Sequence, residues 1–165
     1  MNLVYAASAV VAVVATVMVI TRRDAVHALL YLVVSLLAVA VIMFLLGAAF
    51  VAALEVIIYA GAIMVLFVFV IMLIGPRNDT VSPRTWIGPA ILGLILLAEL
   101  IYVIAGGAAA NPLTVKEVPP RQVGIALLGP YLIAVEITAF LLLAGLVGAF
   151  HLGRRLAVSL GRKED

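Results

Sequence analysis

The chain has 165 residues, of which 67% are hydrophobic and 11% are charged, and its mean hydropathy is +1.37. A soluble domain carries about 25% charged residues. The composition therefore excludes a water-soluble globular protein and indicates an integral membrane protein. The sequence has no cysteine, which excludes thiolate ligation of an iron–sulfur cluster, disulfide bonds and a cysteine nucleophile.

Five apolar segments have about the 20 residues that a helix needs to cross a bilayer. We therefore predict an all-α integral membrane protein with five transmembrane helices in a single membrane domain, residues 1–165. The predicted helices cover about 2–21, 26–47, 50–74, 85–105 and 123–150, followed by a tail at 151–165. Gly47 should begin a short turn after the second helix, and an outer loop is expected at about 106–122. The first apolar run is too long for a signal peptide and has no clear cleavage site, so we expect it to be retained.

The basic residues predict the orientation of these helices. Eight of the ten Lys and Arg residues fall on one side of the predicted membrane, namely Arg22, Arg23, Arg77, Arg84, Arg154, Arg155, Arg162 and Lys163. Positive residues accumulate on the cytoplasmic side. The N-terminus should therefore lie outside and the C-terminus in the cytoplasm. Because the formal charge of +2 arises mainly at helix ends, it indicates topology and not nucleic-acid binding.

Three carboxylates, Glu55, Glu99 and Glu136, lie inside apolar segments. A charged group at the bilayer centre costs at least about 2.5–3.5 kcal/mol, so such residues usually face protein or water. Glu55 and Glu99 can each be read as an interfacial carboxylate or as a proton-accessible functional group. Glu136, about halfway along the fifth segment, is predicted to be the deepest. No Lys or Arg lies within the segments, so partners must be tyrosines, serines, water or other chains.

The third segment combines Glu55 and Tyr59 at a spacing of four residues, which places them on one helix face. Gly61 follows and weakens the helix locally by about 1 kcal/mol relative to alanine. The glycine is consistent with a notch for helix packing or with a π-bulge, a turn with one extra residue that is frequent at functional sites. The spacing alone leaves both interpretations open.

Two other positions carry structural expectations. Pro130 lacks a backbone N–H and predicts a kink or a late helix start in the fifth segment. His27 follows basic residues at the start of the second segment, where we expect contact with solvent or lipid headgroups. The sequence shows no phosphate-binding glycine loop, metal-ligand spacing or Ser/His/Asp set, so we expect no redox or catalytic site in this chain itself.

Residues 25–74 resemble subunit J of bacterial respiratory complex I, the proton-pumping NADH:quinone oxidoreductase, whose mitochondrial counterpart is NADH dehydrogenase subunit 6. The most specific run is LEVIIYAGAIMVLFVF, residues 54–69, and a second match covers residues 129–154 of the fifth segment. The family commonly has Asn-Pro before the Val-His of the second helix, whereas here Asp24 and Ala25 precede Val26 and His27.

The resemblance implies a multi-pass subunit in the bacterial cytoplasmic (inner) membrane that couples quinone reduction to proton translocation. It implies contacts with lipid, the quinone-site subunit, the small subunits A and K and the antiporter-like subunits. FMN, iron–sulfur clusters and quinone would reside in partner subunits. The family's third helix has a π-bulge near the glycine that matches Gly61, and its glutamate and tyrosine match Glu55 and Tyr59. Switching between π and α forms is linked to a water path, for which we add Glu136 as a predicted proton-path residue.

Two alternatives remain at this point. The chain can be a small subunit of a related membrane-bound hydrogenase or of a multisubunit cation/proton antiporter. It can also be a structural anchor of a membrane arm, in which case Tyr59 and Gly61 should tolerate substitution whenever the assembly survives.

Overall fold

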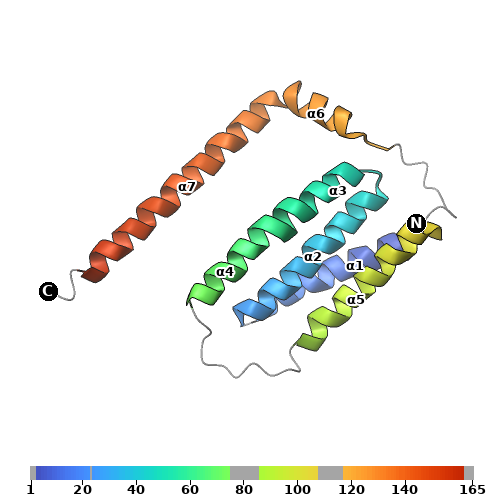
Figure 1. The fold of residues 1–165 in the computed structure, drawn as a ribbon, viewed down its shortest axis with the longest axis horizontal. Coiled ribbons are helices and arrows are strands. Elements are labelled where there is room, and N and C mark those ends of the chain that lie inside the picture. Colours follow the sequence, from blue (N-terminus) through green and yellow to red (C-terminus); the bar gives the residue numbers. More distant parts are fainter. Residues whose placement is uncertain (1–2, 23, 75–85, 108–116, 162–165) are drawn as a thin grey trace. The chain divides into compact units, whose positions relative to one another are not determined.

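The computed structural model describes residues 3–22, 24–74, 86–107 and 117–161 (Figure 1). Residues 75–85 and most of the predicted outer loop, 108–116, lie outside the described residues. The chain forms two compact units, one up to Val118 and one from Pro119 onward. The elements are α1 (Leu3–Thr21), α2 (Ala25–Leu45), α3 (Ala49–Glu55), η1 (Val56–Ile63), α4 (Met64–Ile74), α5 (Ile87–Tyr102), η3 (Val103–Gly107), α6 (Pro120–Leu128) and α7 (Leu132–Gly161).

Within the described residues, five helices are long and apolar enough to cross a membrane, and each falls on a predicted segment. Their spans are Leu3–Thr21, Ala25–Leu45, Ala49–Ile74, Ile87–Ala105 and Leu132–Arg154. The prediction of an all-helical chain with five candidate membrane spans is thus confirmed. The orientation of the termini stays a prediction.

The first unit is organised around α2, which contacts α1, α3, α4, η1 and α5, while α1 also contacts α5 (Figure 1). Its core comprises Val11 and Ala15 of α1, Val34 and Ala38 of α2, and Leu96 of α5. Ala15 and Ala38 have no exposed surface. Lipid is as apolar as these side chains, so membrane helices associate through close packing, which small residues allow. The two alanines therefore explain why α1 and α2 lie together.

Both ends of α2 are fixed by local hydrogen bonds. At its start, Asp24 is the N-cap, and its carboxylate accepts a bond of 3.0 Å from the Val26 backbone N–H. At its end, Gly47 has a φ of 81° and donates to the Phe44 carbonyl, and the next N–H, of Ala48, donates to Met43. This pair of bonds is a Schellman motif, and its left-handed position favours glycine. The sequence prediction that Gly47 begins a turn is confirmed.

The segment predicted as one fifth helix over 123–150 is divided into two helices, and the second continues into the predicted tail at 151–165. The second unit has α6 up to Leu128, a turn at 129–131, and α7 from Leu132 to Gly161. Pro130 cannot donate to a helical carbonyl. The Tyr131 N–H instead bonds to the Ala126 carbonyl at 3.1 Å, and the Leu132 N–H bonds to Gly129 at 3.2 Å. The proline therefore causes the late helix start that was one of its two expected effects.

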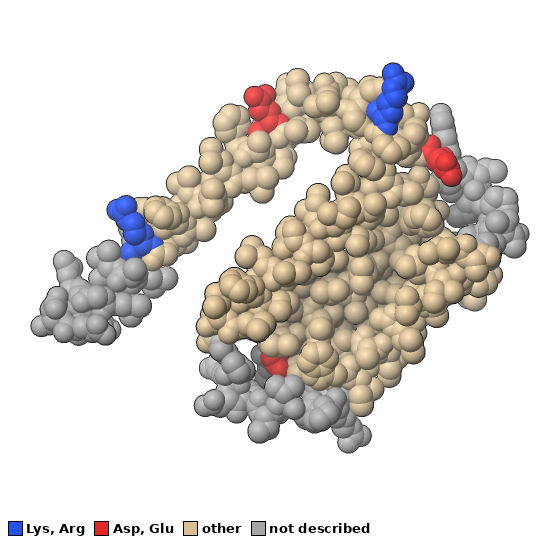
Figure 2. Space-filling view, in the orientation of Figure 1, with Lys and Arg blue, Asp and Glu red and all other residues tan. Residues whose placement is uncertain are grey.

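The surface of the described helices is apolar. Figure 2 shows a face almost free of charged side chains, and large apolar side chains such as Leu3, Leu66 and Ile104 are more than half exposed. A soluble protein rarely exposes contiguous apolar patches beyond a few hundred Å². Such a surface is consistent with lipid or other membrane helices around the chain.

Candidate functional site

The third span is one continuous helix whose type changes in the middle. The α-helix α3 ends at Glu55, the π-helix η1 covers Val56–Ile63, and α4 is α-helical again (Figure 1). At the exit, the Met64 N–H donates to the carbonyls of Gly61 and of Tyr59, five residues earlier. A regular α-helix would bond it to the carbonyl four residues earlier. The π geometry implied by the resemblance is therefore present in the structure.

Gly61 lies within this π-helix, and its surroundings separate the two interpretations of the glycine. A Cβ built on Gly61 would lie 3.3 Å from the Val56 carbonyl oxygen, an atom of the same helix. In the described part of the chain, no atom of a neighbouring helix comes within 4 Å of that position. Gly61 therefore leaves room for the carbonyl five residues earlier, and it is not a packing notch for another described helix of the first unit.

Glu55 immediately precedes the π-helix, and Tyr59 lies in its middle. Glu55 is the last residue of α3 and is half-buried, whereas Tyr59 in η1 is 51% exposed. The large residues Ile57 and Ile58 beside them are also exposed, at 66% and 46%. The structure thus brings Glu55, Tyr59 and Gly61 together in one helical segment whose surface is turned away from the rest of the first unit. A polar face of this kind in a membrane span usually meets protein or water.

A cavity adjoins the start of the π-helix. Its volume is about 390 Å³, and it lies between α2, α3, the first residue of η1 and α5. Small side chains, Ala49, Ala52 and Ala53, contribute the α3 wall, and Val56 is the contribution of η1. The cavity is open on one side, and it provides space beside the helix where the helix geometry changes.

Glu136 has a different place from the one expected. It is exposed and is the fifth residue of α7, because that helix begins only at Leu132. The prediction that it lies halfway along a helix over 123–150 is therefore wrong, and the reason is the break at Pro130. Glu136 belongs to the second unit, which the structure describes separately from the first. Its role as a proton-path residue stays a prediction.

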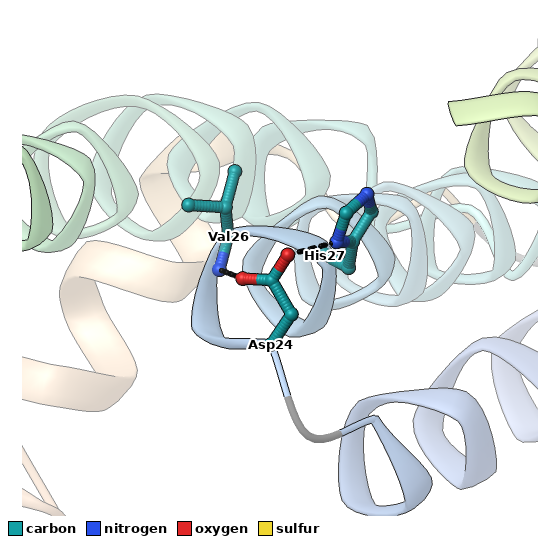
Figure 3. A network of polar contacts seen from close by, with 3 residues as sticks. All are labelled: Asp24, Val26 and His27. Atoms are coloured by element: carbon teal, nitrogen blue, oxygen red, sulfur yellow. Dashed lines mark hydrogen bonds and ion pairs between the residues drawn. The ribbon is translucent and has the colours of Figure 1, made fainter. Parts of the chain in front are cut away.

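A second polar cluster lies where α1 ends and α2 and α5 begin. Figure 3 shows the Asp24 carboxylate bonded both to the Val26 N–H and to the imidazole Nδ1 of His27. His27 is only 3% exposed and packs edge-to-face against Trp86, with 6.5 Å between ring centroids. The expectation of a solvated or headgroup-facing His27 is therefore wrong. The sequence could not reveal this burial, since Trp86 comes from a distant segment.

The same end of the bundle contains a close approach between two helices. The Tyr31 ring of α2 lies 5.5 Å below the Arg22 guanidinium, a cation–π contact. Its hydroxyl reaches Gly88 of α5 so closely that a Cβ built there would lie 2.0 Å from the oxygen. Gly88 is thus required for the contact of α2 with α5, a role that sequence reasoning missed.

Glu99 has a partner within the chain. The Ser8 hydroxyl of α1 donates a hydrogen bond of 2.6 Å to Glu99 Oε2 of α5. Sequence reasoning expected serine among the possible partners of the buried carboxylates but did not identify this one, because 91 residues separate the pair. The interfacial interpretation of Glu99 is thereby weakened.

Comparisons with known proteins agree on one family. The family of NADH-ubiquinone/plastoquinone oxidoreductase chain 6 matches residues 15–152. NADH-quinone oxidoreductase subunit J of Pseudomonas aeruginosa is 51% identical over 152 residues, covering 88% of this chain and 92% of the relative. The subunit J of Escherichia coli K12 is 48% identical over 168 aligned positions, covering 94% and 89%. That of Buchnera aphidicola from Schizaphis graminum is 45% identical over 161 residues, covering 93% and 98%.

These matches extend through the π-helical span, the α1–α2 pair and most of α7, and they include both units of the structure. The resemblance noted in the sequence is therefore confirmed over nearly the whole chain. The chain belongs to the chain 6 and subunit J family of NADH-quinone oxidoreductase, the membrane subunits of respiratory complex I.

Proposed function

We propose that this subunit couples quinone reduction to proton translocation through a change of helix type in its third span. The observation that carries the proposal is the π-helix at Val56–Ile63, with Gly61 inside it and Glu55 and Tyr59 on the same segment. Local π geometry often marks functional sites, because the extra residue is held in a form that a regular helix would not adopt. A helix with two accessible forms can act as a gate.

The geometry defines what such a gate would move. In an α-helix each residue advances the chain by about 1.5 Å and turns it by about 100°. Inserting or removing the extra residue of the π turn at η1 therefore rotates α4 relative to α3 by about 100°. Tyr59 would move with respect to Glu55, and a polar group would enter or leave the surface that faces the neighbouring subunits. A few water molecules between these groups would then connect or separate two halves of a proton path.

Two features of the first unit support this movement. The apolar cavity beside Ala52, Ala53 and Val56 leaves space for side chains displaced by rewinding. The α4 half of the span is loosely held, since Met64 is its buried residue whereas Val65, Leu66 and Phe67 are half exposed or more. Packed cores switch between discrete arrangements, so a change of helix type needs such free volume.

The wider assignment follows from the family and from the distribution of charge. We infer an N-terminus outside and a C-terminus in the cytoplasm, in the bacterial cytoplasmic (inner) membrane. We infer contacts with the quinone-site subunit, with the small subunits A and K and with the antiporter-like subunits. In this arrangement FMN, iron–sulfur clusters and quinone lie in partner subunits, and the present chain contributes Glu55, Tyr59, Gly61 and Glu136 to the coupling path without a redox site of its own. The names of the relatives favour this assignment over a hydrogenase or antiporter subunit.

The test is Gly61→Val in the assembled complex. The added side chain crowds the Val56 carbonyl, which already lies 3.3 Å from a built Cβ, and so disfavours the π form. A bias of about 1.4 kcal/mol between two forms changes their ratio about tenfold. NADH-driven quinone reduction and proton uptake in inverted membrane vesicles, at matched complex content, should both fall.

The matched control is Gly145→Val, because a Cβ built on Gly145 meets nothing within 4 Å. This variant carries the same substitution in another membrane span, and its turnover should equal that of the parent. If Gly61→Val assembles and both rates are unchanged, the gate is excluded and the subunit is a structural anchor.

A further inference from the structure

The buried carboxyl of Glu99 is not used by the gate at η1. It lies on α5, twelve residues after the helix start, and the third span contributes nothing to its hydrogen bond. Its partner Ser8 has no exposed surface, and the bond from Ser8 Oγ to Glu99 Oε2 is 2.6 Å long. Ser8 therefore lies inside the bundle, and Glu99 is part-buried beside it.

The second carboxyl oxygen, Glu99 Oε1, is buried and has no hydrogen-bond partner among the described residues. A buried carboxyl oxygen without a partner is unfavourable, and it is relieved by a proton on the group, by a water molecule or by a cation. The described helices α1, α2 and α5 contain no Lys or Arg. The nearest titratable groups along α1 and α5 are Tyr5 and Tyr102, each three residues from a member of the pair, and α3 carries Glu55.

An apolar layer separates this pair from the other polar groups of the bundle. Val11 and Leu96, each one turn from Ser8 and Glu99 along their helices, belong to the core, together with Val34 and Ala38. On the far side of this layer, Thr16 and Ser35 bond to each other at 2.8 Å. The layer therefore separates the carboxyl from Thr16 and Ser35, and the pair lies nearer to the start of α1 than to its end.

We propose that Glu99 is a proton-binding site in the α1–α2–α5 bundle, with Oε1 as the atom that takes up the proton and Ser8 as its positioning residue. The site is separate from Glu55 and Tyr59. It does not depend on the π-helix changing its form, so the two proposals can fail independently.

Infrared difference spectroscopy of the purified, assembled complex during a pH titration tests the site directly. A proton-binding carboxyl exchanges a carboxylic C=O band for carboxylate bands as the pH rises. One such pair of bands should be lost in Glu99→Gln. The matched control Glu117→Gln, which removes an exposed carboxylate outside the helices, should retain it.

The role of Ser8 is tested with Ser8→Ala and the conservative Ser8→Thr. Loss of the hydroxyl should shift the C=O band, and Ser8→Thr should restore its position. Ser35→Ala, a buried serine beyond the apolar layer, should leave the band in place. These variants decide the question even if Glu99→Gln does not assemble. Spectra identical to the parent in Glu99→Gln, or a band that Ser8→Ala does not move, would overturn the proposal.

Discussion

The α1–α2–α5 bundle and the η1–α4 half of the third span are all apolar enough to lie in a membrane, yet they bury very different amounts of surface. In the bundle, Ala15 and Ala38 are fully buried and the polar residues Ser8, His27 and Ser35 are at most 7% exposed. In η1 and α4, Met64 is the buried side chain, and most others are exposed. The bundle is consolidated by its own contacts, whereas the second region presents its surface to other molecules.

The difference also concerns helix geometry. The bundle helices α1 and α2 are regular, and the side chains of Ser8, Thr16 and Ser35 form hydrogen bonds between helices. The third span carries Tyr59 outward and changes helix type at the same place. Hydropathy alone places both regions in the membrane. Which of them forms the core depends on small residues and on polar pairs, and the following variants test that distinction.

The largest effect is expected from Ala38→Leu, because Ala38 is fully buried between α1 and α2. Overpacking a closed core costs about 1–3 kcal/mol and occasionally more. The amount of assembled complex in the membrane should fall sharply. Ala38→Ser, which hardly changes the volume, should assemble like the parent. Equal assembly of the Leu variant would show that the bundle is as loosely held as α4.

The second-largest effect is expected from Gly88→Ala, which should destabilise the complex by about 2 kcal/mol. The added Cβ would lie 2.0 Å from the Tyr31 hydroxyl, and Tyr31 is 3% exposed, so its ring has little room to move away. The temperature of half-inactivation of the complex should decrease. Tyr31→Phe in the same chain removes the colliding oxygen and should restore most of the loss. Gly93→Ala is the control, since its Cβ meets nothing within 4 Å.

The sequence predicted features that depend on local patterns. Apolar segment length predicts the five spans, Gly47 predicts the turn after α2, and Pro130 predicts the late start of α7. The π geometry at Gly61 followed only from the family resemblance. Spacing cannot distinguish it from a packing notch, because the decisive atom is the carbonyl of Val56 in the same helix.

Features that depend on contacts between distant segments were not predicted. Burial of His27 requires Trp86, which begins the fourth span, and the partner of Glu99 lies 91 residues earlier. A single helix pattern shows which residues share a face and not which face another helix covers. The position of Glu136 was wrong for a related reason, since a depth counted from an uninterrupted segment fails when the helix begins later.

Asp24→Ala should have an intermediate effect. It removes the N-cap of α2 and the hydrogen bond to His27, and loss of a cap costs about 0.5–2 kcal/mol. Thermal inactivation of the complex should occur at a lower temperature. Asp24→Asn retains an oxygen that accepts from the Val26 N–H and should recover most of the stability. If Asn and Ala variants are equally unstable, the contribution of Asp24 lies in its charge and not in capping.

The smallest effect is expected from the hydroxyl pair of Thr16 and Ser35, which joins α1 to α2 at 2.8 Å. Hydrogen bonds between membrane helices contribute about 0.6 kcal/mol on average, because the separated helices find other partners. A double-mutant cycle with Thr16→Val and Ser35→Ala, read from thermal inactivation of the complex, should give a coupling energy of about that size. A much larger coupling would mean that polar pairs, and not the alanine contacts at Ala15 and Ala38, distinguish the bundle from the exposed third span.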